Sequence, residues 1–204
     1  MILQARVLLL LLLATVPAAA QPKPPPGGQA WPCVQPKTPK LSLGAVWSGP
    51  DLGAPNAWTQ DLDAAELAQK LASRRTPMDQ VDGLLDAFAA QAGAAAKTRL
   101  PLVFAGVFDV IDAERAKIVA GIERYALGQQ KLANRLRDEG EKLTLAKDSP
   151  AAAETPQSKE LQEHLAWDTR IFEERARSLT YVCEVPVLLE QRVFEIGRRI
   201  QARL

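Results

Sequence analysis

Two apolar repeats of equal length, one in the middle of the chain and one at its end, constrain the fold most strongly. Each repeat advances by alternating steps of four and three residues without a break. The first series consists of Phe104, Phe108, Ile111, Arg115, Ile118, Ile122, Tyr125, Gln129, Leu132, Leu136, Glu139 and Leu143. The second consists of Leu161, Leu165, Asp168, Phe172, Arg175, Leu179, Val182, Pro186, Leu189, Val193, Ile196 and Ile200. A seven-residue period sustained this long predicts two supercoiled helices.

The two repeats predict a coiled-coil-like antiparallel helical hairpin, because only a short turn beginning at residues 147–150 separates them. We expect the first long helix to have Pro101 in its first turn and to extend to about Ala146. The second should start at Thr155 as the cap and Pro156 in the first turn, and continue to the end of the chain. At about 1.5 Å per residue, this hairpin is about 65–70 Å long.

Two shorter helices precede the hairpin. Asp63 is a candidate cap for the first, with Glu66 completing a capping box, and this helix should end near Arg75. A second should start at Thr76 and Pro77 and fade near residues 97–98. Abundant Ala and Leu with few aromatic residues favour helices over sheets. The predicted fold class is therefore all-α, an uneven four-helix bundle within residues 59–204.

The region before the bundle, residues 21–58, differs in composition from the rest. Ten of the fifteen prolines lie at or before Pro55. Residues 21–29 are expected to form a flexible tether. Three tryptophans follow, and we interpret residues 30–58 as an extended arm packed on the helices, because a solvated linker has no use for them. These three tryptophans, Trp31, Trp47 and Trp58, are also a candidate partner surface. The alternative, which we prefer, is that they fill grooves between helices.

The chain contains two cysteines, Cys33 and Cys183. We expect one structural disulfide that ties the arm to the last helix. Two buried thiols are the alternative, and a redox-active pair is less favoured because the chain has no C-x-x-C motif. Pro186 lies in the same helical turn as Cys183, and we expect a kink there because proline has no N–H to donate.

The first 20 residues have the pattern of a signal peptide. Arg6 precedes an apolar run, residues 7–16, and small residues at Ala18 and Ala20 suit cleavage before Gln21. The run is shorter than the roughly 20 residues that a membrane anchor needs. The sequence therefore predicts an exported protein, periplasmic or secreted, of about 184 residues with no stable membrane span after cleavage.

The sequence lacks the residues that most functional classes of protein require. Acidic and basic side chains nearly balance, which argues against a nucleic-acid partner and disfavours an adaptor at the membrane face. His164 is the only histidine, so neither a hydrolase triad nor a paired-iron site can be assembled. We expect His164 to be a partly exposed surface residue. The sequence predicts no catalytic residue, no metal ligand and no cofactor.

The polar residues within the two apolar repeats are the more specific indication of a site than the residues considered so far. A charge buried in a helical seam must be paired, and pairing can fix the register of the two helices. If the turn is centred near residue 151, Arg115 faces Val187 and can reach Glu184 or Glu190. The candidate buried polar cluster is Arg115, Gln129, Asp168, Arg175, Glu184 and Glu190. We expect these residues to set the register. The alternative is a polar pocket in the bundle.

These observations predict an exported, non-catalytic component of the periplasm that works by binding protein or as a structural element. The partner would be another protein or a second copy of the chain, contacted through the long helices. The alternative is a small-ligand-binding protein or an enzyme that uses the polar cluster.

Overall fold

The computed structural model describes residues 31–148 and 155–204. The predicted signal peptide, the tether over residues 21–29 and most of the turn between the long helices lie outside these residues. The described part of the chain is helical and contains no strand, which confirms the all-α prediction.

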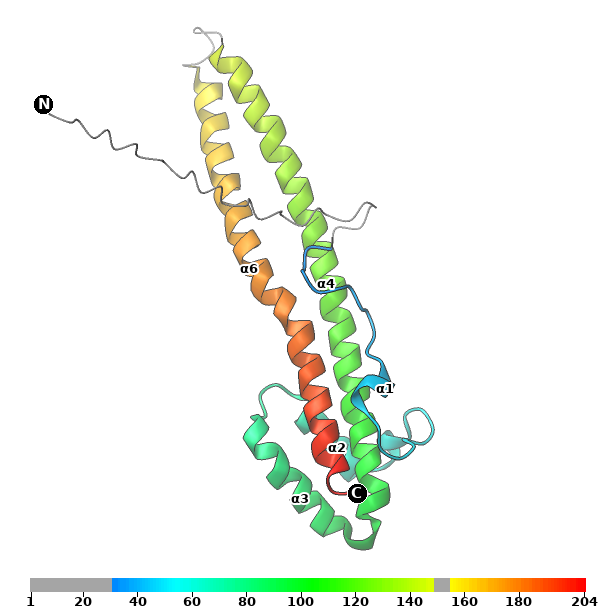
Figure 1. The fold of residues 1–204 in the computed structure, drawn as a ribbon. Coiled ribbons are helices and arrows are strands. Elements are labelled where there is room, and N and C mark those ends of the chain that lie inside the picture. Colours follow the sequence, from blue (N-terminus) through cyan, green and yellow to red (C-terminus); the bar gives the residue numbers. More distant parts are fainter. Residues whose placement is uncertain (1–30, 149–154) are drawn as a thin grey trace, which may run out of the picture.

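The largest element is an antiparallel pair of long helices, α4 (Ala96–Lys147) and α6 (Pro156–Gln201). They lie side by side along most of their length (Figure 1). Contacts between Gln129 and Phe172, and between Arg135 and Asp168, relate the two helices about a midpoint close to residue 151. The predicted hairpin and its register are therefore confirmed.

The bundle forms at the end of the hairpin away from the turn, where α2 (Leu62–Ala72) and α3 (Val81–Ala92) gather against the long helices (Figure 1). Short helical turns connect them: η1 (Ala57–Gln60), η2 (Met78–Gln80) and η3 (Gly93–Ala95). The main apolar core contains α4 residues only as far as Ile111 and α6 residues only from Leu189. Beyond these positions, the two long helices pack on each other and on the arm.

The start of α2 differs from the prediction. Asp61, and not Asp63, is the N-cap, since its carboxylate accepts a hydrogen bond from the backbone N–H of Ala64 at 3.1 Å. Arg99 donates two further hydrogen bonds to the same carboxylate at 2.6 Å. The sequence offers two aspartates as caps, and contact with α4 selects the first. The helix ends at Ala72, three residues before the predicted end near Arg75.

The boundary between α3 and α4 was also predicted wrongly. Gly93 adopts a positive φ of 54° and ends α3, whereas the sequence pattern extended this helix to residues 97–98. Those residues instead form the first turn of α4, so Pro101 lies inside the helix and not in its first turn. Thr76 does not cap α3, because its hydroxyl donates to the carbonyl of Lys70.

The last helix starts as predicted, with the Thr155 side chain accepting from the N–H of Ser158 and Pro156 in the first turn. It continues through Pro186 as one helix to Gln201. None of the helices described in residues 31–148 and 155–204 combines the length and the apolar character that crossing a bilayer requires.

The arm lies along the hairpin and is attached to it at both ends. Cys33 and Cys183 form the predicted disulfide, with Cα atoms 5.5 Å apart. Farther along the arm, α1 (Leu43–Val46) leads into Trp47, whose ring stacks on Phe104 with centroids 4.2 Å apart. Gly197 makes this approach feasible, because a Cβ there would lie 2.8 Å from the Val46 carbonyl oxygen.

Candidate functional site

The predicted tryptophans of the arm mostly fill grooves. Trp47 is buried, and its indole N–H donates to the carbonyl of Pro50. Trp58 is half-buried against Gly106 of α4 and donates to Asp109 at 2.8 Å. Trp31 is half-buried, and its indole donates to Gln35 within the arm. The fourth tryptophan, Trp167 on α6, was not singled out by the sequence analysis and is 60% exposed.

Arg115 is the buried polar residue at the junction of the arm and the hairpin. Its guanidinium donates to the Thr38 carbonyl, to the Thr38 hydroxyl at 3.0 Å and to the Pro186 carbonyl at 3.3 Å. Pro186 has no N–H and interrupts the helical ladder, and its own carbonyl accepts from Arg115. Glu190 lies 3.6 Å away as the ion-pair partner but is half-exposed. Arg115 therefore fastens the arm to α6 chiefly through carbonyl groups.

A pocket of about 460 Å³ lies between the arm and α6 beside this arginine. Its lining includes Trp31, Val46, Pro186 and Phe194 together with Arg115. Most of the Arg115 donors already have hydrogen-bond partners in the protein. Few of them are therefore left to bind a molecule in the pocket, which is largely apolar in character.

The other members of the predicted polar cluster are spread along the hairpin. Gln129 is buried and donates to the Phe172 carbonyl, but its own Oε1 is buried without a hydrogen-bond partner. Asp168 is buried and lies one helical turn beyond, paired with Arg135. Arg175 was expected in the seam but is exposed, and only its carbonyl takes part, accepting from Tyr125. The residues therefore do not form one site.

Glu184 is exposed and faces a different part of the arm from Glu190. It lines a shallow hollow of α6 together with Pro32 and Cys33. It is not the ion-pair partner of Arg115, so of the two carboxylates offered by the sequence the structure brings only Glu190 to that guanidinium.

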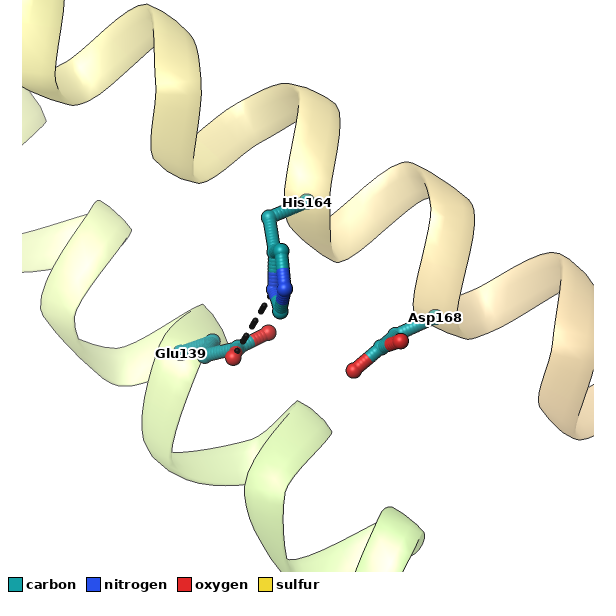
Figure 2. A group of neighbouring side chains, drawn as sticks. All are labelled: Glu139, His164 and Asp168. Atoms are coloured by element: carbon teal, nitrogen blue, oxygen red, sulfur yellow. Dashed lines mark hydrogen bonds and ion pairs between the residues drawn. The ribbon is translucent and has the colours of Figure 1, made fainter.

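Three metal-ligating side chains meet farther along the hairpin, between α4 and α6. Glu139, His164 and Asp168 each offer one ligand atom, and these atoms all lie within 4.8 Å of one another (Figure 2). His164 Nδ1 is 3.2 Å from Glu139 Oε1. The His164 side chain is 57% exposed, whereas those of Glu139 and Asp168 are 12% and 6% exposed. Folding the two repeats about residue 151 places Glu139 opposite His164, which is the sequence signal for this pair.

Arg192 is a buried cation that the sequence analysis missed. Its guanidinium donates to the carbonyls of Leu71 and Thr76 at 2.8 and 2.9 Å and to the Met78 sulfur. Burial lowers the pKa of this guanidinium below its ordinary value. Leu71 lies in the last turn of α2, where the helix dipole favours a positive charge.

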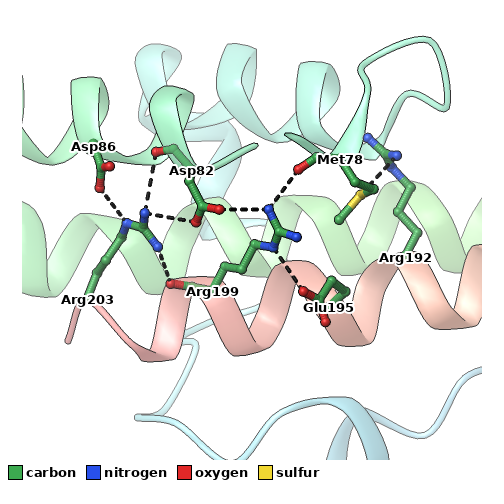
Figure 3. A network of polar contacts seen from close by, with 7 residues as sticks. All are labelled: Met78, Asp82, Asp86, Arg192, Glu195, Arg199 and Arg203. Atoms are coloured by element: carbon green, nitrogen blue, oxygen red, sulfur yellow. Dashed lines mark hydrogen bonds and ion pairs between the residues drawn. The ribbon is translucent and has the colours of Figure 1, made fainter. Parts of the chain in front are cut away.

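Two further arginines, Arg199 in α6 and Arg203 just beyond the end of α6, hold α3 in place. Arg199 donates to Asp82 at 2.8 Å and to the Met78 carbonyl, and Arg203 donates to Asp82 and Asp86 (Figure 3). The hydrogen bond that Arg203 donates to Asp86, and then the one to Asp82, raise the pKa of Arg203 against the opposing effect of burial. The cluster explains how α3, which has few buried side chains of its own, stays on α6.

Comparison with known protein families, with curated proteins and with solved structures finds no match to this chain.

Proposed function

We propose that this chain is an exported, non-catalytic protein that associates with a second copy of itself through its helical hairpin. One observation carries the proposal: α6 has a second stripe, displaced by one residue from its contact with α4. It alternates steps of three and four and is exposed or half-buried throughout. The stripe consists of His164, Trp167, Ile171, Glu174, Ser178, Tyr181, Val185 and Leu188.

The stripe occupies a free face of α6. On a helix of 3.6 residues per turn it lies about 100° from the α4 contact and opposite the arm, which covers the side of Ala176, Thr180 and Cys183. Its continuation toward the C-terminus contains Arg192 and Arg199, and the α2–α3 region covers that part. The bundle thus covers one end of the stripe, Val185 packs partly against the apolar core, and His164 at the other end pairs with Glu139 of α4. The exposed side chains between these ends are Trp167, Glu174, Ser178, Tyr181 and Leu188.

The stripe is complementary to itself in the antiparallel direction. A two-fold axis near residue 176 places Trp167 opposite Val185 of the second copy, and Ile171 opposite Tyr181. The same axis places Glu174 opposite Ser178. Apolar residues then meet in two layers on each side of the polar centre, and the outermost layer pairs His164 with Leu188. Polar layers fix register in antiparallel coiled coils.

One pair of opposite charges beside the stripe fits the same register. Arg170 lies near Glu184 of the second copy, whereas Arg175 and Arg177 lie close to the same residues of the second copy at the two-fold axis. Opposite charges at such flanking positions set partner choice and orientation in coiled coils. Trp167 and Tyr181, at 60% and 72% exposure, supply the aromatic area that protein interfaces favour.

The disulfide between Cys33 and Cys183 supports the exported location, since such bonds persist in oxidising compartments. Export predicts that natively secreted protein begins at Gln21. An intact-mass measurement that finds Met1 retained would contradict this part of the proposal.

Sedimentation velocity of the disulfide-bonded chain over a wide dilution series tests self-association. We expect a concentration-dependent dimer that Tyr181→Glu abolishes, because the substitution places a charge in an apolar layer. The matched control is Leu145→Glu on α4, since Leu145 is also 72% exposed but lies off the stripe. A natural chain that stays monomeric at all concentrations would overturn the proposal. So would equal weakening of the dimer by Tyr181→Glu and Leu145→Glu.

A second candidate function is small-ligand binding in the 460 Å³ pocket beside Arg115, whose volume lies in the range of ligand sites. Phe194→Ala, which removes part of the apolar lining, would weaken such binding and leave the sedimentation of the dimer unchanged.

A further inference from the structure

We infer that Glu139, His164 and Asp168 form a binding site for a divalent transition-metal ion, for which Zn²⁺ suits the donor set best. One imidazole nitrogen and two carboxylates are established types of zinc ligand, and three protein ligands leave a fourth position open to water. The site shares His164 with the end of the α6 stripe, but metal binding does not require self-association.

The backbone presents the three ligands together. His164 and Asp168 are four residues apart on α6, so they share one face of the helix. Glu139 faces them from α4 across the hairpin (Figure 2). Because both helices continue through the site, the positions of the three Cα atoms are fixed before any ion binds.

The distances suit a small contraction around an ion. Zinc bonds of about 2.0–2.1 Å place neighbouring ligand atoms of a tetrahedral site about 3.3 Å apart. His164 Nδ1 and Glu139 Oε1 are already 3.2 Å apart. One Asp168 carboxylate oxygen lies within 4.8 Å of both of the other ligand atoms.

Two buried carboxylate oxygens at the site lack hydrogen-bond partners among the described residues: Glu139 Oε2 and Asp168 Oδ2. Asp168 Oδ2 lies 2.6 Å from Arg135 Nη2, but this ion pair does not have hydrogen-bond alignment. Buried carboxylates are costly unless a cation or donors compensate them. A bound cation between the two would satisfy both.

Arg135 is the competing cation. Its side chain is 54% exposed, so it can move into solvent when a metal ion takes Asp168. Removing this arginine should therefore strengthen metal binding. If the cluster were only a structural set of ion pairs, removing Arg135 would not increase the affinity for metal.

Titration calorimetry with Zn²⁺, on metal-stripped full protein without a histidine tag, tests the site. We expect one ion per chain, with His164→Gln and Glu139→Gln each weakening binding at least about tenfold and Arg135→Ala strengthening it. Glu163→Gln, an exposed carboxylate beside His164, is the matched control and should change nothing. Circular dichroism confirms that each variant is folded.

Absence of saturable Zn²⁺ binding would overturn the inference, as would binding that survives both His164→Gln and Glu139→Gln. Weaker binding in Arg135→Ala would also contradict it. Repeating the titration with Tyr181→Glu separates metal binding from self-association, because that substitution leaves all three ligands in place.

Discussion

Arg115, Arg192 and Arg99 each hold two elements together through a different kind of partner. Arg115 uses carbonyls of the arm and of α6, and Arg192 uses carbonyls at and beyond the end of α2. Arg99 uses carboxylates, Asp61 and Asp63, at the start of α2. The difference decides what each substitution should cost, because a stranded buried carboxylate is far more costly than a stranded carbonyl near solvent.

Arg115→Ala should lower the free energy of unfolding by about 1–3 kcal/mol, since it leaves carbonyls without donors. Breaking a fully buried ion pair would cost more, about 3–5 kcal/mol. Glu190 is half-exposed, so water can solvate its carboxylate once the arginine is gone. Urea denaturation measures the difference, with Glu190→Gln as the control, expected to cost less than about 1 kcal/mol. Equal losses from both variants would mean that the ion pair, and not the carbonyls, fastens the arm.

Asp61→Asn should reduce the loss of stability in acid. Hydrogen bonds from Arg99, followed by the Ala64 N–H, lower the pKa of Asp61 below its ordinary 3.8 against the opposing effect of burial. The unfolded chain therefore takes up this proton first, and the stabilisation is present above about pH 4 and lost as the pH falls through the folded-state pKa. Asparagine still caps α2, so the substitution removes the charge and keeps the helix start.

Urea denaturation between neutral pH and pH 2 should give a shallower decline below pH 4 for Asp61→Asn than for the natural chain. Asp79→Asn, at an exposed carboxylate of η2, is the control and should follow the natural chain. Identical acid profiles for the natural chain and Asp61→Asn would contradict the role assigned to Arg99.

At the scale of the elements, close contact between α2 and α4 depends on one glycine. A Cβ at Gly106 would lie 2.6 Å from the Ala68 Cβ and 2.8 Å from the Trp58 ring. Gly128 lies on the same helix with nothing within 4 Å of its Cβ position. The two glycines therefore separate helix propensity from packing.

Gly106→Ala should lower the free energy of unfolding by about 1–3 kcal/mol, because α2 and Trp58 must move away. Gly128→Ala should raise it by about 0.5–1 kcal/mol through helix propensity alone. Thermal melts followed by circular dichroism compare the two. A Gly106→Ala variant as stable as the natural chain would mean that α2 packs more loosely than described.

The sequence predicted the long elements better than the short ones. Regular heptads fix α4 and α6 over many turns, and their shared midpoint near residue 151 gave the register. Helix ends depend on contacts across the fold: Arg99 selects Asp61 over Asp63 as a cap, and Gly93 turns the chain between α3 and α4. Composition could not show either effect.

At the scale of the whole molecule, the sites were harder to predict than the fold. The α6 sequence contains two stripes displaced by one residue, and nothing in the period alone says which one faces α4. Arg175 was assigned to the inner face but is exposed, whereas Trp167 was passed over. Glu139 and His164 come together only once two distant segments are folded onto each other.

The proposed self-association makes the hairpin, rather than the bundle, the working part of the molecule. In that arrangement the bundle of each copy lies toward the turn of the other, and the two arms remain on outer faces. The register of the pairing is therefore the central claim, and it depends on Arg170 lying next to Glu184 of the second copy.

A charge exchange at these two positions tests that claim most directly, with sedimentation velocity as the measurement. Arg170→Glu and Glu184→Arg should each weaken the dimer, because each brings like charges together across the interface. The double variant should recover most of the association, since the opposite charges are restored with their places exchanged. If the double variant loses as much dimer affinity as the two single variants lose together, the antiparallel register and the interface built on it are contradicted.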